Sequence, residues 1–166
     1  MKIDYPKFDD WVWKSHLNKI IDPTEFINDH IDHMFFIGTD SQNYGRKRSK
    51  PSRCIFTSVI IAYKRGRGGI SITSTNKTEY IRSLRQRLMI EVMRSLECAW
   101  FLDKFVDEDS AVKICKPEIH MDVNIDPKHK SSLYRQELVG IVTAQGFEAV
   151  CKPNAWAASI IADRFC

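Results

Sequence analysis

Apolar and polar residues follow two different periods along the chain, and the changes of period locate the predicted elements. Residues 34–40 form a short apolar run that ends in polar residues, which is typical of a buried strand with an exposed carboxyl end. Residues 54–63 and 70–75 are rich in β-branched and aromatic side chains, and the three glycines within 64–69 predict a hairpin between them. These segments predict three consecutive antiparallel strands.

The period then becomes helical over residues 78–105. Residues 118–124 alternate between apolar and polar side chains, as a strand with one buried face does. A helix is predicted over 131–144, a fifth strand over 147–151 and a last helix over 155–165. The apolar face of the helix predicted over residues 78–105 carries Ile81, Leu84, Leu88, Val92, Leu96 and Ala99.

The first 33 residues are predicted to form a helical extension. Asp22 suits the N-cap of a short helix, Pro23 its first position and Glu25 the capping-box position. The residues before Asp22 lack a regular period and are expected only to pack against the main body. Three meandering strands followed by helical crossovers predict one α/β domain over residues 1–166, with a mixed sheet and helices on both faces.

Composition indicates a globular protein, with 43% hydrophobic and 28% charged residues. No apolar run approaches the roughly 20 residues that a membrane span requires. The acidic start of the chain lacks the apolar core of a signal peptide, so we expect a cytoplasmic protein with no membrane partner. The five cysteines are widely spaced without a C-x-x-C pair, which predicts reduced thiols rather than a zinc site.

The net charge of +4 is modest, but the charge is unevenly distributed. Residues 41–78 contain nine lysines and arginines and no acidic residue. Such a segment can bind the phosphate backbone of nucleic acid through counterion release, and a merely solubilising loop is an equally weighted alternative. The residues of this segment that we select as candidate substrate contacts are Arg46, Lys47 and Arg48.

Two aspartates lie on predicted strands in positions where their carboxylates can meet. Asp40 ends the first strand, and Asp122 lies in the fourth; if these strands are parallel neighbours, both side chains emerge in one region. Mg²⁺ prefers carboxylate oxygens, and two ions about 3.5–4 Å apart can stabilise the attacking and leaving oxygens of a phosphoryl displacement. The pair therefore predicts a site for Mg²⁺ or Mn²⁺, with two ions.

Two further acids can complete this site. At about 100° per residue, Glu91 lies beside the apolar stripe of the long helix, whereas Glu97 points nearly opposite to it. On the last helix, Asp163 follows Ser159 by one turn among small residues that permit a close approach to the sheet. A solvated acid beside Arg164 is the alternative interpretation of Asp163.

Neighbouring polar residues are candidates for supporting roles. His120 shares a predicted strand face with Asp122, and a hydrogen-bonded structural histidine is the favoured interpretation over a ligand. Lys130 and Lys152 lie at loop ends where they can bind phosphates, with ordinary solvent exposure as the alternative. The residues expected to support the carboxylates are Ser41, Gln42, His120, Asn124 and Ser159.

Several motifs resemble the YkuK-type ribonuclease-H-like proteins, a bacterial and phage group of poorly defined function. The resemblance covers roughly residues 30–165 and rests on Gly38-Thr39-Asp40-Ser41-Gln42, Ile119-His120-Met121-Asp122-Val123-Asn124, Lys130-Ser131-Ser132 and the segment from Lys152-Pro153-Asn154 to Ala162-Asp163-Arg164. It implies a ribonuclease-H-like fold with a five-stranded mixed sheet in the order 3-2-1-4-5. It also implies that Asp40, Glu91, Asp122 and Asp163 bind two metal ions, although no motif surrounds Glu91.

The leading hypothesis is a divalent-metal-dependent nuclease that hydrolyses phosphodiester bonds in RNA, DNA or a hybrid, without a cysteine or serine nucleophile. The alternative is a catalytically silent nucleic-acid-binding module on the same fold. That module would bind nucleic acid without Mg²⁺ and would not cleave it. The oligomeric state is left open by the sequence.

Overall fold

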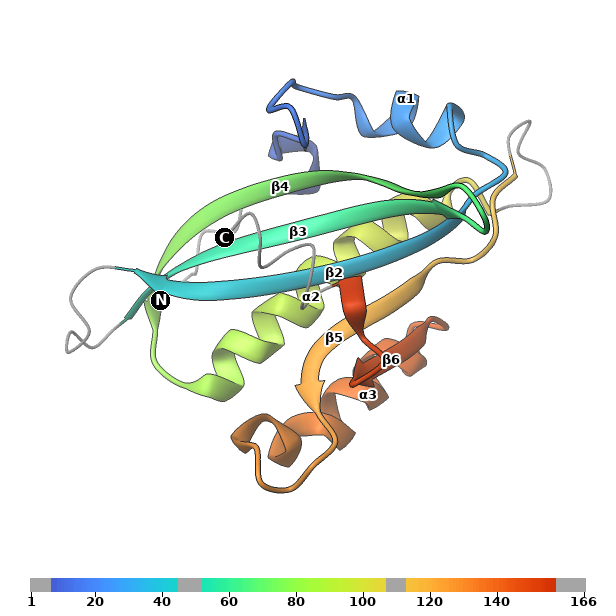
Figure 1. The fold of residues 1–166 in the computed structure, drawn as a ribbon. Coiled ribbons are helices and arrows are strands. Elements are labelled where there is room, and N and C mark those ends of the chain that lie inside the picture. Colours follow the sequence, from blue (N-terminus) through green and yellow to red (C-terminus); the bar gives the residue numbers. More distant parts are fainter. Residues whose placement is uncertain (1–6, 45–51, 107–112, 158–166) are drawn as a thin grey trace.

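The computed structural model describes residues 7–44, 52–106 and 113–157, which form a mixed sheet with helices packed on it (Figure 1). In this part of the chain, no helix is long and apolar enough to cross a membrane. The strands are β1 (Lys14–Ser15), β2 (Met34–Tyr44), β3 (Ser52–Lys64), β4 (Gly68–Ile81), β5 (Glu118–Asn124) and β6 (Glu148–Lys152). The helices are α1 (Pro23–Asn28), α2 (Leu84–Asp103) and α3 (Arg135–Ala144), with 3-10 turns at Phe8–Asp10 and Lys130–Tyr134.

The described strands lie in the order β1-β4-β3-β2-β5-β6. The five predicted strands correspond to β2 through β6, and they keep the expected order 3-2-1-4-5. β2, β3 and β4 are antiparallel neighbours, whereas β5 is parallel to both β2 and β6. The predicted count of five is one too few, because the N-terminal segment adds β1 to the edge of β4 by pairing Ser15 with Ile72.

Two predicted boundaries are wrong because strand pairing extends further than the local pattern indicates. β2 and β3 remain paired as far as Tyr44 and Arg53, so Asp40 lies inside β2 rather than at its end. β4 continues to Ile81 against β3, although residues 78–81 were expected to begin the long helix. That helix begins at Leu84, where the Ser83 hydroxyl accepts a hydrogen bond from the Gln86 N–H at 3.1 Å.

Alternation along β2 divides the apolar residues between the two faces of the sheet. Phe35 and Ile37 join the main core, which the buried faces of α2 and α3 complete from one side (Figure 1). Phe36 points to the other face, where it packs in a smaller cluster with Trp156 and Ala157. The last helix, expected over 155–165, lies almost entirely outside the described residues.

A buried arginine joins α2 to β3, β4 and the N-terminal segment. Arg94 is only 1% exposed. Its Nε donates to Ser58 Oγ at 3.1 Å, and its Nη2 donates to Asn76 Oδ1 at 2.7 Å. The guanidinium carbon lies 3.9 Å from the centroid of the Trp11 ring, in cation–π geometry. These contacts satisfy a charge that would be very costly to bury alone.

A second set of polar contacts fixes α2 against β2. The Ser95 hydroxyl on α2 donates to Thr39 Oγ1 at 2.9 Å, and Thr39 Oγ1 lies 3.0 Å from Ser58 Oγ on β3. Thr39 precedes Asp40 directly, so these bonds hold the helix next to the predicted site.

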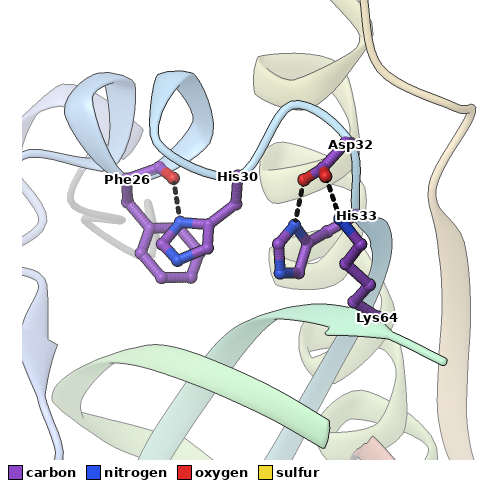
Figure 2. A network of polar contacts seen from close by, with 5 residues as sticks. All are labelled: Phe26, His30, Asp32, His33 and Lys64. Atoms are coloured by element: carbon purple, nitrogen blue, oxygen red, sulfur yellow. Dashed lines mark hydrogen bonds and ion pairs between the residues drawn. The ribbon is translucent and has the colours of Figure 1, made fainter. Parts of the chain in front are cut away.

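A network of polar side chains joins the connection between α1 and β2 to the end of β3 (Figure 2). Asp32 forms an ion pair with Lys64 and a hydrogen bond with His33, whose Nδ1 lies 2.7 Å from the carboxylate. The hydrogen bonds from Lys64 and His33 lower the pKa of Asp32 to about 2. His30 Nδ1 donates to the Phe26 carbonyl at 2.6 Å and holds the end of α1. Because Asp32 is exposed, we assign this network a local role in the connection rather than a large stabilising one.

We predict that Arg94→Met lowers the free energy of unfolding by about 2–4 kcal/mol, because it removes charge-assisted hydrogen bonds and leaves buried acceptors unsatisfied. Urea denaturation followed by circular dichroism measures this. Arg85→Met is the matched control on the same helix: Arg85 pairs with Glu137 at the surface, so its loss should destabilise the protein much less than the loss of Arg94. Equal losses for the two variants would contradict the role assigned to Arg94.

Candidate functional site

Asp40 and Asp122 lie on the same face of two adjacent parallel strands. β2 and β5 are paired up to Thr39 and Met121, and each aspartate is the next residue on its strand. Asp40 and Asp122 therefore directly follow the last positions at which β2 and β5 pair with each other. The predicted relation between these two acids depends on the strands being parallel neighbours, and they are.

The third predicted acid approaches from α2. Glu91 is 6% exposed, and its Oε1 accepts a hydrogen bond from the Ser41 hydroxyl at 2.5 Å. Ser41 was expected to support the carboxylates, and its side chain, on the helix face of β2, donates its hydroxyl hydrogen to Glu91. Asp40, Glu91 and Asp122 all line one pocket of about 290 Å³. Glu97 is partly exposed and does not line this pocket, as its position on the helix indicated.

Basic side chains line the same pocket. Lys152, the last residue of β6, forms an ion pair with Asp122 Oδ1. Lys130 lies at the start of the 3-10 turn that follows β5, and it is exposed. Both lysines were predicted as phosphate contacts, and both line the pocket, as do Arg87 and His129. The pocket thus combines carboxylates with cations that can hold an anionic substrate.

The pKa of Glu91 is shifted by burial and by the charges of its neighbours in the pocket. Burial, together with the smaller effect of the negative charges of Asp40 and Asp122, raises the pKa of Glu91 from 4.5 to about 8. The hydrogen bond from Ser41 and the positive charge of Arg87 act in the opposite direction. Glu91 therefore binds a proton at neutral pH unless a cation takes the proton's place.

His120 is a structural residue at the edge of this region. It is 2% exposed, its Nδ1 accepts a hydrogen bond from the Ala157 N–H at 3.2 Å, and its Nε2 lies 3.5 Å from Glu118 Oε2. Its ring packs against Phe36 and Trp156. Burial lowers the pKa of His120 to about 4, so the ring is neutral at physiological pH. The favoured interpretation of a hydrogen-bonded histidine matches this geometry.

Asn124 shapes the loop that carries Lys130. Its Oδ1 accepts a hydrogen bond from the Asp126 N–H at 2.9 Å, and its own N–H donates to Ser131 Oγ at 3.2 Å. These bonds turn the chain after β5 and bring the basic loop over the pocket, which Asn124 also lines. Gln42 is exposed on the strand that carries Asp40, two residues further along.

The donor set suits Mg²⁺ or Mn²⁺, because both prefer carboxylate oxygens and because a cation would offset the charge that burial disfavours on Glu91. Within residues 7–44, 52–106 and 113–157, however, no three Asp, Glu, His or Cys side chains are gathered closely enough to hold an ion. Asp122 is instead paired with Lys152, and Glu91 is bonded to Ser41.

The remaining predicted site residues lie outside the described part of the chain. They are Arg46, Lys47, Arg48, Ser159 and Asp163.

Sequence reasoning missed Arg87 and His129. Arg87 lies one helical turn before Glu91, and this spacing could have indicated that the two share a helix face. His129 is adjacent to Lys130 in the loop, but no spacing in the sequence indicates that it reaches the pocket.

Comparison with known proteins gives two matches. A family model described as ribonuclease H-like matches residues 19–166. The chain is also similar to the uncharacterized protein YkuK of Bacillus subtilis (strain 168), with 29% identity over 142 residues that cover 78% of this chain and 76% of YkuK. No solved structure matches the chain.

We predict that Glu91→Gln makes the metal-free protein more stable at pH 8, by about 2–4 kcal/mol relative to wild type. Between pH 4.5 and about 8 the folded protein binds more protons at Glu91 than the unfolded chain does, so wild-type stability falls as pH rises. Glutamine does not ionise and avoids this loss. Urea denaturation in EDTA at pH 5 and pH 8 measures the effect.

Glu97→Gln is the control, because Glu97 lies on the same helix and is partly exposed. Its stability difference from wild type should stay nearly constant between the two pH values. A pH-independent difference for Glu91→Gln would show that this carboxyl is not held in the buried, high-pKa state.

Proposed function

The chain belongs to the ribonuclease H-like family, and on that basis we propose that it is a divalent-metal-dependent nuclease that hydrolyses phosphodiester bonds in nucleic acid. One observation carries this proposal: Asp40, Glu91 and Asp122, from two strands and a helix, line one pocket together with Lys130 and Lys152. Carboxylates for cations and ammonium groups for phosphates are the side chains that such a reaction requires.

In this proposal Asp40, Glu91 and Asp122 hold the Mg²⁺ or Mn²⁺ ions, with Asp163 as a fourth ligand. The chemistry supplied by a bound pair of ions is stabilisation of charge on the attacking and leaving oxygens. Ser41 orients Glu91 through the hydrogen bond to its Oε1. The apolar side chains of Leu84 and Leu88 line the pocket next to these acids.

The nucleic-acid backbone is held by basic residues in this proposal. Lys130 and Lys152 contact phosphates at the pocket, and Arg46, Lys47 and Arg48 extend the contact beyond it. Such contacts determine affinity and position without reading the base sequence, so RNA, DNA and hybrid duplexes are all candidate substrates. Gln42, His120, Asn124 and Ser159 are proposed to support the groups around them rather than to touch the reacting phosphate.

We predict that Asp40→Asn and Asp122→Asn each lower the cleavage rate by about 100-fold or more, because each removes a negative charge from the proposed ion site. The assay uses labelled single-stranded, duplex and hybrid substrates with Mg²⁺, Mn²⁺ or EDTA. Asp103→Asn is the control, since Asp103 is an exposed acid at the end of α2 and should leave the rate within about twofold. Cleavage that survives both EDTA and Asp40→Asn would contradict the proposal.

A second candidate function is a nucleic-acid-binding module without catalytic activity. The Lys152–Asp122 ion pair favours it, because that pair lowers the negative charge available to metal ions. For this module, binding measured by fluorescence anisotropy would be the same in EDTA and in Mg²⁺. Cleavage would then be undetectable with either metal on every substrate of the panel.

A further inference from the structure

We propose that Lys152 is a switch that couples metal binding to nucleic-acid binding: its ammonium holds Asp122 until a substrate phosphate draws it away and frees the carboxylate for the ion. The inference rests on the proposed function and goes beyond it, because it assigns one residue to both partners. It starts from the ion pair between Lys152 Nζ and Asp122 Oδ1.

An irregularity in strand pairing creates this contact. β5 and β6 are paired in register from Glu118 to Met121, but the next pair joins Asn124 to Lys152, which directly follows the partner of Met121. Two residues of β5, Asp122 and Val123, are therefore inserted opposite a single step of β6. The insertion brings the end of β6 beside Asp122, so that the lysine reaches its carboxylate.

The ammonium can leave Asp122 without moving the strand. Lysine carries a compact charge on a flexible four-carbon stem, and the Lys152 side chain is 35% exposed. Asp122 is 24% exposed, so its side chain reaches the surface, although the Oδ1 atom that contacts Lys152 is itself covered. Lys130 lines the same pocket and can help to bind a phosphate there. That phosphate would offer the Lys152 ammonium an anion other than Asp122.

A divalent cation and the Lys152 ammonium compete for the same carboxylate. The ammonium occupies Asp122 Oδ1 and also repels a cation placed beside it. Nucleic acid that removes the ammonium strengthens metal binding. By thermodynamic linkage, the metal must strengthen nucleic-acid binding by the same factor.

The test measures Mn²⁺ binding to the chain of residues 1–166 without nucleic acid, by the electron paramagnetic resonance signal of free Mn²⁺. Lys152→Met should bind Mn²⁺ about five- to tenfold more tightly than wild type. Lys130→Met removes the same charge from the same pocket without removing the partner of Asp122, so its affinity should change by less than about threefold. Lys152→Arg keeps the charge and should bind Mn²⁺ as wild type does.

A second measurement addresses the other half of the switch. In EDTA, a 20-nucleotide RNA–DNA hybrid should bind Lys152→Met at least about threefold more weakly than wild type, because the phosphate contact is lost. The circular dichroism spectra of the variants establish that they are folded. If one variant is unfolded, Lys152→Gln replaces Lys152→Met in both measurements.

The proposal is overturned if Lys152→Met binds Mn²⁺ no more tightly than wild type, or if Lys152→Met and Lys130→Met gain equally. This failure differs from a failure of the proposed function. Wild-type cleavage that depends on Asp40, together with unchanged Mn²⁺ affinity in Lys152→Met, retains the nuclease and removes the switch. Tighter Mn²⁺ binding in Lys152→Met without any cleavage retains the competition and removes the nuclease.

Discussion

The packing of α2 against β2 is the constraint on which the candidate site depends. Thr39 and Ser41 project to the helix face of the strand, where they bond Ser95 and Glu91, and Asp40 between them projects to the opposite face. The alternation of side chains over Thr39, Asp40 and Ser41 therefore determines both the position of the helix and the direction of the aspartate. A slip of one residue in the register of β2 would exchange the two faces and turn Asp40 away from the face that carries Asp122.

The site is a compromise between opposite charges in a partly buried space. Burial disfavours the ionised form of Glu91, and the nearby aspartates add to that effect, while Arg87 and the Ser41 hydroxyl oppose it. Lys152 forms an ion pair with Asp122. Metal-free protein thus balances its acids with a proton and with its own cations, and any bound ion must be compared with these internal partners.

Alternation and periodicity were sufficient to predict most strands, because these depend on the local pattern. The meeting of Asp40 and Asp122 was predicted only on the condition that their strands are parallel neighbours, which the structure fulfils. The order of the central strands came from resemblance to a family rather than from the pattern. What could not be predicted depends on contacts between distant segments: the extension of β4 to Ile81, the pairing of Ser15 with Ile72, and the approach of Arg87 to the pocket. In each case a tertiary partner overrides or completes a weak local preference.

The two-residue strand β1 attaches the N-terminal segment to the sheet, although the strand is short. It covers the outer edge of β4 at Ile72, and the segment around it places Trp11 on the buried guanidinium of Arg94 and Trp13 in the main core. Uncovered sheet edges can pair with other chains, and a buried arginine stripped of its aromatic cover would face water. A fragment trimmed to the residues matched by the family model, which begin at 19, would lose these three contacts and be prone to aggregate.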